Sequence, residues 1–487
     1  MPNLPRSTPE AQGIASSAIS SFVEAVGRKK LELHSLMLVR HGQVIAEGWW
    51  RPYRATDIHL LYSMSKSFTA TAVGIAVAES LLEVNDRVVS FFPDETPDSL
   101  DEHLAHMTVE HLLTMTTGHL KDTIGQVAKH PNSWVNSFLS LPPDVPPGTV
   151  FTYNNGATFM LSAILHKLTG TPLLEYLRPR LLEPLGIEDA YWQQNPQGIQ
   201  LGFSGLHVTT ESVARFGQLY LDEGHWENKQ LIPQAWVHAA KTKHIQTNPP
   251  PEDEVTDWAQ GYGYQFWLCR HDAYRGDGAF SQFCVIMPEQ DAVLAITSGE
   301  NDMQAVLDLV WQHLLPAFES TAEPTALPES QTSFDELQET LARLEYPPLK
   351  GSSDSSIGSR VLGQTFHFDS VAVQDPAHTS FDTLQLKRSA DTWSLLLEGE
   401  KTHEIVFGHE EWRAGTTTFF TLEQARTATC GAWLDAHTLE VQVRYIETPH
   451  CLNLTLHFTE DALQLDMRWN VRFSDLDLPP MNGHRLG

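Results

Sequence analysis

The sequence predicts two structured parts, an α+β or α/β part followed by an antiparallel β-barrel or sandwich. Residues 1–320 alternate helical patterns with short strands, whereas residues 360–487 alternate apolar and polar side chains with a period of two. Between them, residues 321–359 are rich in proline and serine, which is typical of a linker. A chain of 487 residues exceeds one ordinary core, so several domains are expected.

The first part contains a clear hairpin pattern and a clear helical pattern. The stretch SLMLVRHGQVIAEGWW, residues 35–50, predicts two strands joined by a turn at His41 and Gly42. The stretch FTATAVGIAVAESLL, residues 68–82, is apolar over enough residues to predict a buried helix. We therefore expect helices and strands to share this part.

The second part follows a single amphipathic helix. The linker contains FDELQETLARL, which has helical periodicity. Beyond it, segments such as TWSLLLEGE, TLEVQVRYIE and LNLTLHF are separated by turn residues about every 8 to 12 positions. This spacing favours an antiparallel sandwich or barrel.

Composition limits the class of protein. The chain has 32 basic and 61 acidic residues, a net charge of −29, so its field repels phosphate backbones and nucleic acid is not an expected partner. A membrane span needs about 18 consecutive apolar residues, and the sequence has none. The N-terminus lacks a secretory pattern, and the four cysteines form neither a disulfide framework nor a CxxC pair. These features predict a cytoplasmic enzyme.

The stretch LYSMSKSF, residues 61–68, carries the first candidate chemistry. If a helix begins near Ser63, then Lys66 lies one turn further on the same face, within reach of the hydroxyl. An amine can remove the serine proton only if its pKa falls below its ordinary value of about 10.4, and the apolar run after Lys66 provides the necessary desolvation. The alternative is a helix cap followed by a solvated lysine.

Two further motifs accompany this pair. In PGTVFTYNNGATFMLSAILHKLTG, residues 147–170, a glycine turn leads to Tyr153 and Asn155 and then to a helix. In YRGDGAFSQFCVI, residues 274–286, a glycine-rich segment enters a strand. Taken alone, Tyr153 and Asn155 favour a capped turn before this helix.

Together the three motifs resemble those of the serine β-lactamase and penicillin-binding-protein superfamily, which are SxxK, YxN and K-T-G. The resemblance extends to phrases over nearly all of residues 7–316. These phrases include STPEAQGI, LEVNDRVVSFFP, MTVEHLLTMTTGH, LLEPLGIEDAYW and GFSGLHVTTESVARFGQLYLDEG. The resemblance implies an α+β fold with an antiparallel sheet flanked by helices and an all-helical region. Within this superfamily, the sequence resembles class C β-lactamase-like esterases and 6-aminohexanoate-dimer hydrolases.

The resemblance also implies catalytic roles. Ser63 would be the acylated nucleophile, Lys66 its proton acceptor, and Tyr153 a second base and the acid for the leaving group. Asn155 would orient the lysine and the substrate carbonyl. We expect the lysine charge to lower the pKa of the tyrosine.

The third motif departs from the family pattern. Gly276 stands where β-lactamases hold lysine, and Asp277 stands where they hold threonine. We therefore expect poor turnover of β-lactams and a preference for neutral or cationic substrates, unless Asp277 is simply a turn residue. Gly276 and Gly278 would allow the strand to approach the substrate closely, and the N–H of Ala279 would form an oxyanion hole with that of Ser63.

Other motifs carry weaker predictions. GFSGL, residues 202–206, does not match the GxSxG elbow, and no HExxH occurs. His103, His106 and His111 cluster near a helix start and make a metal site conceivable. Four aromatic residues are expected in the core or in a pocket wall, namely Tyr262, Tyr264, Phe266 and Trp267.

These observations predict a serine hydrolase that acts through an acyl-enzyme on a small ester or linear amide. The alternatives are a D-amino-acid peptidase or transpeptidase-like enzyme, and a catalytically silent scaffold of the same fold. No cofactor or metal is expected, and assembly into an oligomer is left open. The domain at residues 360–487 is expected to be a small barrel, similar to the lipocalin-like barrels that related hydrolases append.

Overall fold

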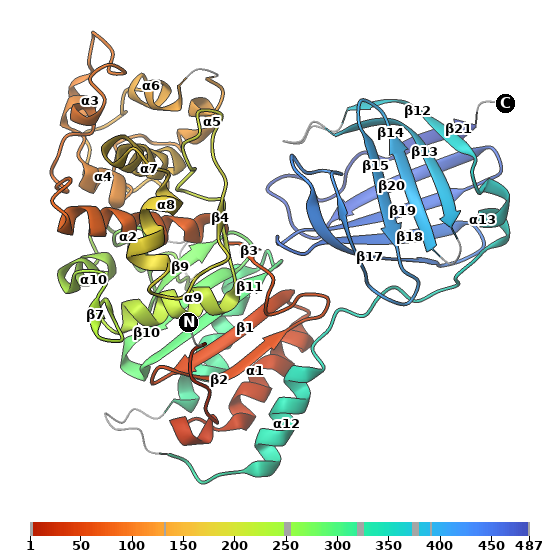
Figure 1. Cartoon of the computed structure of the whole chain (residues 1–487), viewed down its shortest axis with the longest axis horizontal. Coiled ribbons are helices and arrows are strands. Elements are labelled where there is room, and N and C mark those ends of the chain that lie inside the picture. Colours follow the sequence, from red (N-terminus) through yellow and green to blue (C-terminus); the bar gives the residue numbers. More distant parts are fainter. Residues whose placement is uncertain are drawn as a thin grey trace. The chain divides into compact units, whose positions relative to one another are not determined.

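The computed structural model describes residues 3–130, 133–247, 255–318, 326–372, 379–389 and 392–485. The chain divides into two compact units (Figure 1). Unit 1 comprises Met1–Gly48, Ile58–Ser298 and Asp302–Ala342, and unit 2 comprises Trp49–Asp57, Gly299–Asn301 and Arg343–Gly487. Residues 321–325, at the start of the predicted linker, lie outside the described residues.

Unit 1 contains most of the helices. They are α1 (Ser16–Lys29), α2 (Ser65–Ala78), α3 (Glu102–His106), α4 (Val109–Leu113), α5 (Ile124–Val127), α6 (Trp134–Leu139), α7 (Asn155–Thr169), α8 (Leu173–Leu177), α9 (Thr210–Leu221), α10 (Gln234–Lys241), α11 (Met303–Leu309) and α12 (Gln331–Ala342). The short helix α13 (Ser356–Val361) belongs to unit 2.

The strands of unit 1 form one large sheet and two small ones. They are β1 (Leu33–Arg40), β2 (Gln43–Trp49), β3 (His59–Leu60), β4 (Tyr191–Trp192), β5 (Leu206–Val208), β6 (His225–Trp226), β7 (Lys229–Gln230), β8 (Trp267–Leu268), β9 (Tyr274–Gly278), β10 (Gln282–Met287) and β11 (Ala292–Ser298). The large sheet has the order β2-β1-β11-β10-β9-β8. The predicted hairpin is confirmed, because β1 and β2 are neighbours and both His41 and Gly42 adopt positive φ.

The large sheet is flanked by helices, as the resemblance implies. Helix α9 packs against β1, β10 and β11, and α1 packs against α11 and α12. A separate helical region, which includes α4, α6 and α7, lies beside α2 (Figure 1). The predicted α+β class is therefore confirmed.

Helix α2 is buried on every side, as the apolar run predicts. Apart from Lys66, it consists of small, hydroxyl-bearing and apolar residues, so no polar face has to reach solvent. Gly74 permits a particularly close contact, because a Cβ built there would lie 2.5 Å from the ring of Trp236. Such tight packing on all sides holds the start of α2, and with it Ser63 and Lys66, firmly in place.

Unit 2 is built around a ten-stranded antiparallel meander. Its strands are β12 (Thr365–Ala372), β13 (Ser380–Ser389), β14 (Thr392–Glu398), β15 (Thr402–Phe407), β16 (Arg413–Thr417), β17 (Ala425–Trp433), β18 (Thr438–Tyr445), β19 (Cys451–Phe458), β20 (Ala462–Trp469) and β21 (Met481–Arg485). Successive strands pair, except at β15 and β16, and the first strand, β12, pairs with the last, β21. Of the two predicted forms, the structure therefore takes the barrel.

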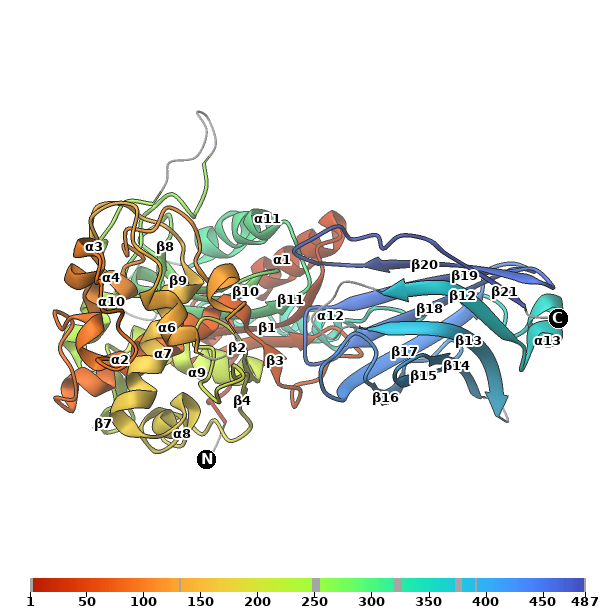
Figure 2. The same ribbon diagram turned by 90° about the horizontal axis from the view of Figure 1, so that it is seen from above.

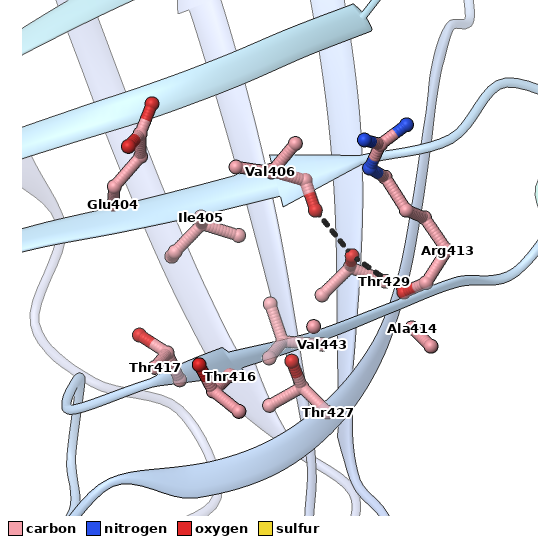
Figure 3. A pocket seen from close by; sticks show the side chains of 11 residues that line it. Glu404, Ile405, Val406, Arg413, Ala414, Thr416, Thr417, Thr427, Thr429 and Val443 are labelled. Carbon is pink, nitrogen blue, oxygen red and sulfur yellow. Dashed lines mark hydrogen bonds between the residues drawn. The ribbon is translucent and has the colours of Figure 1, made fainter.

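The two ends of this sheet meet at a seam between β15 and β16. The hydroxyl of Thr429 donates to the carbonyl oxygens of Val406 at 2.5 Å and Arg413 at 3.2 Å, which ties the two strands together (Figure 3). Beyond this tie the strands enclose a cavity of about 270 Å³ with several threonine side chains in its wall. Backbone hydrogen bonds also close the seam, because the N–H of Gly431 donates to the oxygen of Gly408 at 2.8 Å and the N–H of Gly408 donates to the oxygen of Thr429 at 3.3 Å. These contacts and the Thr429 hydroxyl thus take the place of a continuous ladder between β15 and β16.

Apolar side chains from alternate positions line the barrel interior. On β20, for example, Leu463, Leu465 and Met467 are buried, and the residues between them are more exposed. Figure 2 shows the strands from the side, with α13 at one end of the barrel. Ile357 and Val361 of α13 join the same core. The period-two pattern of the sequence therefore marks the inward-facing residues.

A segment between β2 and β3 belongs to unit 2. The backbone of Arg51 exchanges hydrogen bonds with Leu344 and Tyr346, and the carboxylate of Asp57 accepts from Arg426 at 2.9 Å. The sequence contains no signal for this pairing, which joins residues that are about 290 to 370 positions apart.

The structure also bears on the predictions about cysteines and membrane spans. All four cysteines are free and buried. Across the described residues, no helix combines the length and apolar character needed to cross a bilayer.

Candidate active site

Ser63 and Lys66 lie together at the start of α2. Ser63 is in a single 3₁₀ turn, Tyr62–Met64, and Lys66 is in the first turn of the α-helix that follows. The Nζ of Lys66 donates to the Oγ of Ser63 at 3.0 Å. Lys66 is only 1% exposed, whereas Ser63 is partly exposed. A substrate can therefore reach the hydroxyl while the amine stays away from water.

Lys66 makes two further polar contacts. Its Nζ donates to Oδ1 of Asn155 at 2.7 Å and to the backbone oxygen of Phe203 at 2.9 Å. Burial lowers the pKa of Lys66 to about 7, although the nearby carboxylates of Asp122 and Asp277 act in the opposite direction. A substantial fraction of this lysine is thus neutral near pH 7, as a proton acceptor must be.

Tyr153 lies on the other side of the serine. Its hydroxyl hydrogen-bonds with Ser63, and its ring centroid is 4.7 Å from the Nζ of Lys66. Burial raises the pKa of Tyr153 well above its ordinary value, and the hydrogen bond to Ser63 only partly offsets this. The expectation that Lys66 lowers this pKa is wrong, because desolvation dominates. Tyr153 therefore holds its proton near pH 7.

Asn155 is held in place by the carboxylate of Asp122, a residue that the sequence does not single out. Asn155 is the first residue of α7, and the side chain of Asn154 caps this helix by accepting from the N–H of Gly156 at 3.0 Å. The carboxylate of Asp122 accepts from the backbone N–H of Asn155 at 2.9 Å and from its Nδ2 at 2.6 Å. This contact turns Oδ1 of Asn155 toward Lys66. Asp122 lies in a loop without any motif, so no sequence signal marks it.

Two glycines let strand β9 approach the serine turn. A Cβ on Gly278 would lie 2.1 Å from the backbone oxygen of Leu61, two residues before Ser63. A Cβ on Gly276 would lie 3.0 Å from the Cγ of Met64. Strand β9 therefore lies against the serine turn at Gly278, where only a glycine fits, and its close approach to a substrate stays a prediction.

The turn after β9 is held by one glutamine. Phe280 and Ser281 both adopt positive φ, and the Nε2 of Gln282 donates to the backbone oxygens of Ala279 at 3.1 Å and Phe280 at 2.9 Å. Ala279, the predicted oxyanion donor, thus begins a turn with fixed geometry. Gln282 was not identified from the sequence.

Asp277 forms a buried ion pair beside the site. It lies within β9 and accepts from the Nε of Arg275 at 2.7 Å, so the alternative of a turn aspartate is wrong. Arg275 is fully buried, with Trp258 4.5 Å from its guanidinium and Cys269 within 3.0 Å of its Nη1. Burial raises the pKa of Asp277, and the pairing with Arg275 lowers it. The guanidinium is thus engaged with protein groups rather than presented to substrate.

Aromatic rings build one wall of the site. Trp267 stacks on Tyr153 with 5.6 Å between ring centroids, and Tyr262 meets both rings edge-on. Tyr262, Tyr264, Phe266 and Trp267 are all buried, as predicted. This wall excludes water from the phenol and accounts for the desolvation of Tyr153.

The histidine cluster does not form a metal site. His111 accepts from the N–H of Thr108 at 3.1 Å and thereby caps α4, while His106 contacts the backbone oxygen of Glu102. Within the part of the chain that the structure describes, no three His, Cys, Asp or Glu side chains gather closely enough to hold a metal ion.

We predict that Gly278→Ala disrupts the site more than Gly276→Ala. The new Cβ at residue 278 meets backbone, so β9 or the serine turn must shift, whereas at residue 276 it meets side chains that can adjust. We expect Gly278→Ala to slow labelling of Ser63 by a fluorophosphonate about 100-fold, the effect of displacing a reactive group by about 1 Å. Equal labelling rates for both variants and the wild type would contradict this geometry.

One family model and several known proteins are similar to this chain. The family model described as "Beta-lactamase" matches residues 22–314. A 6-aminohexanoate-dimer hydrolase from Paenarthrobacter ureafaciens is 23% identical over 285 residues, covering 55% of this chain and 73% of that protein. Esterase EstB from Burkholderia gladioli is 25% identical over 204 residues, covering 37% of this chain and 52% of the esterase.

A solved structure extends the similarity to both units. The crystal structure of SurE with D-Leu aligns with a TM-score of 0.51 at 19% identity, covering 96% of this chain and 99% of that chain. At this level of identity the likeness concerns the fold alone.

Proposed function

This chain belongs to the beta-lactamase family, and we propose that it is a serine hydrolase that forms an acyl-enzyme at Ser63 and transfers the acyl group to water. The observation that carries the proposal is the contact between the Nζ of Lys66 and the Oγ of Ser63 at 3.0 Å, made by a lysine whose pKa burial lowers to about 7. A solvated lysine would be charged and could not take the proton.

The proposed acylation uses four groups. Neutral Lys66 takes the proton of Ser63 as its oxygen attacks the substrate carbonyl. The backbone N–H groups of Ser63 and Ala279 stabilise the resulting oxyanion. Tyr153 then donates its proton to the leaving oxygen or nitrogen, and the proton on Lys66 restores the phenol. Water reverses the sequence, with the acyl group leaving Ser63 as a carboxylic acid.

The proposed substrate is a small neutral ester or a linear amide. Support comes from Gly276 and Asp277, which leave the third motif without a cation for a substrate carboxylate. The relatives are named as a 6-aminohexanoate-dimer hydrolase and an esterase, which act on amide and ester bonds respectively. A direct test is to assay p-nitrophenyl esters, a linear aminohexanoate dimer, D-alanyl peptides and nitrocefin. Turnover of nitrocefin or D-alanyl peptides with no hydrolysis of the first two would overturn the proposed substrate class.

We predict that the enzyme discriminates against anionic esters, because Arg275 is engaged by Asp277 and the third motif offers no cation to a substrate carboxylate. Hydrolysis of p-nitrophenyl hemisuccinate should be at least about tenfold slower in kcat/KM than that of p-nitrophenyl butyrate, which corresponds to ~1.4 kcal/mol. The general repulsion by a net charge of −29 is screened by salt, but the cost of desolvating a substrate carboxylate that meets no cation in the site is not. The difference should therefore persist in 0.5 M NaCl. Its disappearance in salt would assign it to the overall charge instead.

We predict that Asp122 positions Asn155 and tunes Lys66. In the wild type, kcat/KM should rise with pH through about 7, because only neutral Lys66 accepts the proton. Asp122→Asn removes a carboxylate that raises the pKa of Lys66, so this limb should move to lower pH. The rate at the plateau should fall about tenfold or more, because Asn155 loses its partner.

The control for this variant is Asp144→Asn, which removes a carboxylate that accepts from the N–H of Leu120 at 2.9 Å. It should leave the pH profile in place. An Asp122→Asn profile that coincides with the wild type would show that Asp122 does not act on Lys66.

A further inference from the structure

The side chain of Gln282 joins the turn after β9 to the end of β11. Besides its two bonds to the oxygens of Ala279 and Phe280, its Nε2 donates to the backbone oxygen of Ser298 at 2.7 Å. Its Oε1 accepts from the N–H of the same Ser298 at 3.1 Å. Because carbonyl oxygens surround Nε2 and an N–H faces Oε1, only one orientation of this fully buried amide satisfies the contacts.

The turn that Gln282 holds has an unfavourable backbone. Phe280 and Ser281 adopt φ values of 63° and 65°. Two successive residues with positive φ are usually asparagine and glycine, because a Cβ is crowded in this conformation. A turn with phenylalanine and serine in these places would relax if it were free, so the contacts around it must hold it.

A pair of aromatic rings ties this turn to the serine turn. The ring of Phe280 meets that of Tyr62 edge-on, with 5.3 Å between the ring centroids. Tyr62 also has positive φ, 46°, and it directly precedes Ser63, while Phe280 directly follows Ala279. Each N–H group of the proposed oxyanion hole thus lies next to a residue with strained backbone, and these two residues contact each other.

We propose that Gln282 is a positioning residue that fixes the N–H of Ala279 relative to that of Ser63. The inference rests on the acyl-enzyme mechanism proposed above. Strained backbone that neighbouring contacts enforce is concentrated at functional sites, and an oxyanion hole requires donors that are in place before the reaction. Gln282 is fully buried, so it acts through the turn and not on the substrate. Without its amide, the turn relaxes and the N–H of Ala279 moves away from the oxyanion.

The variant Gln282→Met, made in the full chain, tests this inference. Methionine has a similar length but no amide, so it removes the clamp. We expect kcat/KM for p-nitrophenyl butyrate to fall about 100-fold, which is the effect of losing or displacing one oxyanion donor. Affinity for butylboronic acid should fall by a similar factor, because its tetrahedral adduct with a serine places an oxygen in the oxyanion hole. The ester concentration that half-saturates the first-turnover rate reports ground-state binding and should change less than threefold.

The matched control is Gln230→Met. The Nε2 of Gln230 also donates to two backbone oxygens, those of Glu223 at 2.8 Å and Ile232 at 2.6 Å, but in the small sheet of β6 and β7. This variant should leave kcat/KM and the affinity for butylboronic acid within twofold of the wild type. If Gln282→Met fails to fold, Gln282→Asn gives the same test, because its amide is one methylene too short to bridge the turn and Ser298.

Two results would overturn the inference while Ser63 remains the nucleophile. One is wild-type kcat/KM and butylboronic acid affinity in the Gln282 variant. The other is an equal loss of ester affinity and of butylboronic acid affinity, which would assign Gln282 a general structural role. Failure of the proposed function is a distinct result, because Ser63→Ala would then keep wild-type turnover and the wild type would not bind butylboronic acid. The inference about Gln282 would fall with it.

Discussion

Replacing Ser63 by alanine should reduce hydrolysis of the best ester substrate at least about 10⁴-fold, because no other group replaces the nucleophile of an acyl-enzyme mechanism. The variant should also lose labelling by fluorophosphonates. Its fold should stay intact, because the serine is partly exposed and its hydroxyl contacts only the site partners Lys66 and Tyr153. Steady-state kinetics and the thermal midpoint, measured on the same preparation, check both expectations.

Ser67→Ala is the matched control. It removes a hydroxyl one turn further along α2 that donates to the backbone oxygen of Gln265 at 2.9 Å and does not contact Lys66. It should lower stability by about 1 kcal/mol and leave the labelling of Ser63 in place. If Ser63→Ala retained wild-type turnover, Ser63 would not be the nucleophile and the acyl-enzyme mechanism proposed here would fail.

Lys66→Met should slow acylation about 10³-fold to 10⁴-fold, which is the upper range for losing a general base. Methionine fills a similar volume but leaves the oxygens of Asn155 and Phe203 without their donor. The rate of p-nitrophenol release in the first turnover measures acylation directly, and it should fall while the affinity for the ester changes little.

The variant Lys66→Arg tests whether Lys66 acts as a base or through its positive charge. Arginine keeps the charge but is not deprotonated in proteins, so it cannot accept the serine proton. We expect this variant to be about as slow as Lys66→Met. Retention of more than about a tenth of the wild-type rate would mean that Lys66 acts by its charge, and the assignment of a neutral base would fail.

The local part of this site could be predicted from the sequence. Ser63 and Lys66 are three residues apart, so a helix alone places them in contact. The glycines of β9 were also predictable, because a glycine between strand residues indicates close backbone approach. Tyr153 and Asn155 required the resemblance to a family, since their distance along the chain from Ser63 gives no geometric information.

The remaining features depend on tertiary contacts. Asp122, Gln282 and the carbonyl of Phe203 act through contacts with no local pattern. The pKa of Tyr153 was predicted in the wrong direction, because the sequence shows a neighbouring lysine but not the rings of Tyr262 and Trp267 that remove water. Desolvation is a property of packing, and packing is not visible in local spacing.

In the fold too, local sequence patterns were predictable and contacts between distant parts of the chain were not. The period-two pattern of the C-terminal part correctly predicts antiparallel strands, and the turn residues separate them. Closure into a barrel depends on the pairing of β12 with β21 and on Thr429 at the seam, which join distant parts of the chain. Alternation alone is compatible with a sandwich as well.

The central claim is that substrate acylates Ser63 with the help of a neutral lysine. The most direct test is peptide mapping by mass spectrometry after the enzyme turns over p-nitrophenyl butyrate and is quenched in acid. We predict a butyryl group on the peptide that contains Ser63, with an amount that rises as the pH is raised through about 7. Turnover without an adduct at Ser63, or an adduct on another residue that persists in Ser63→Ala, would contradict the account.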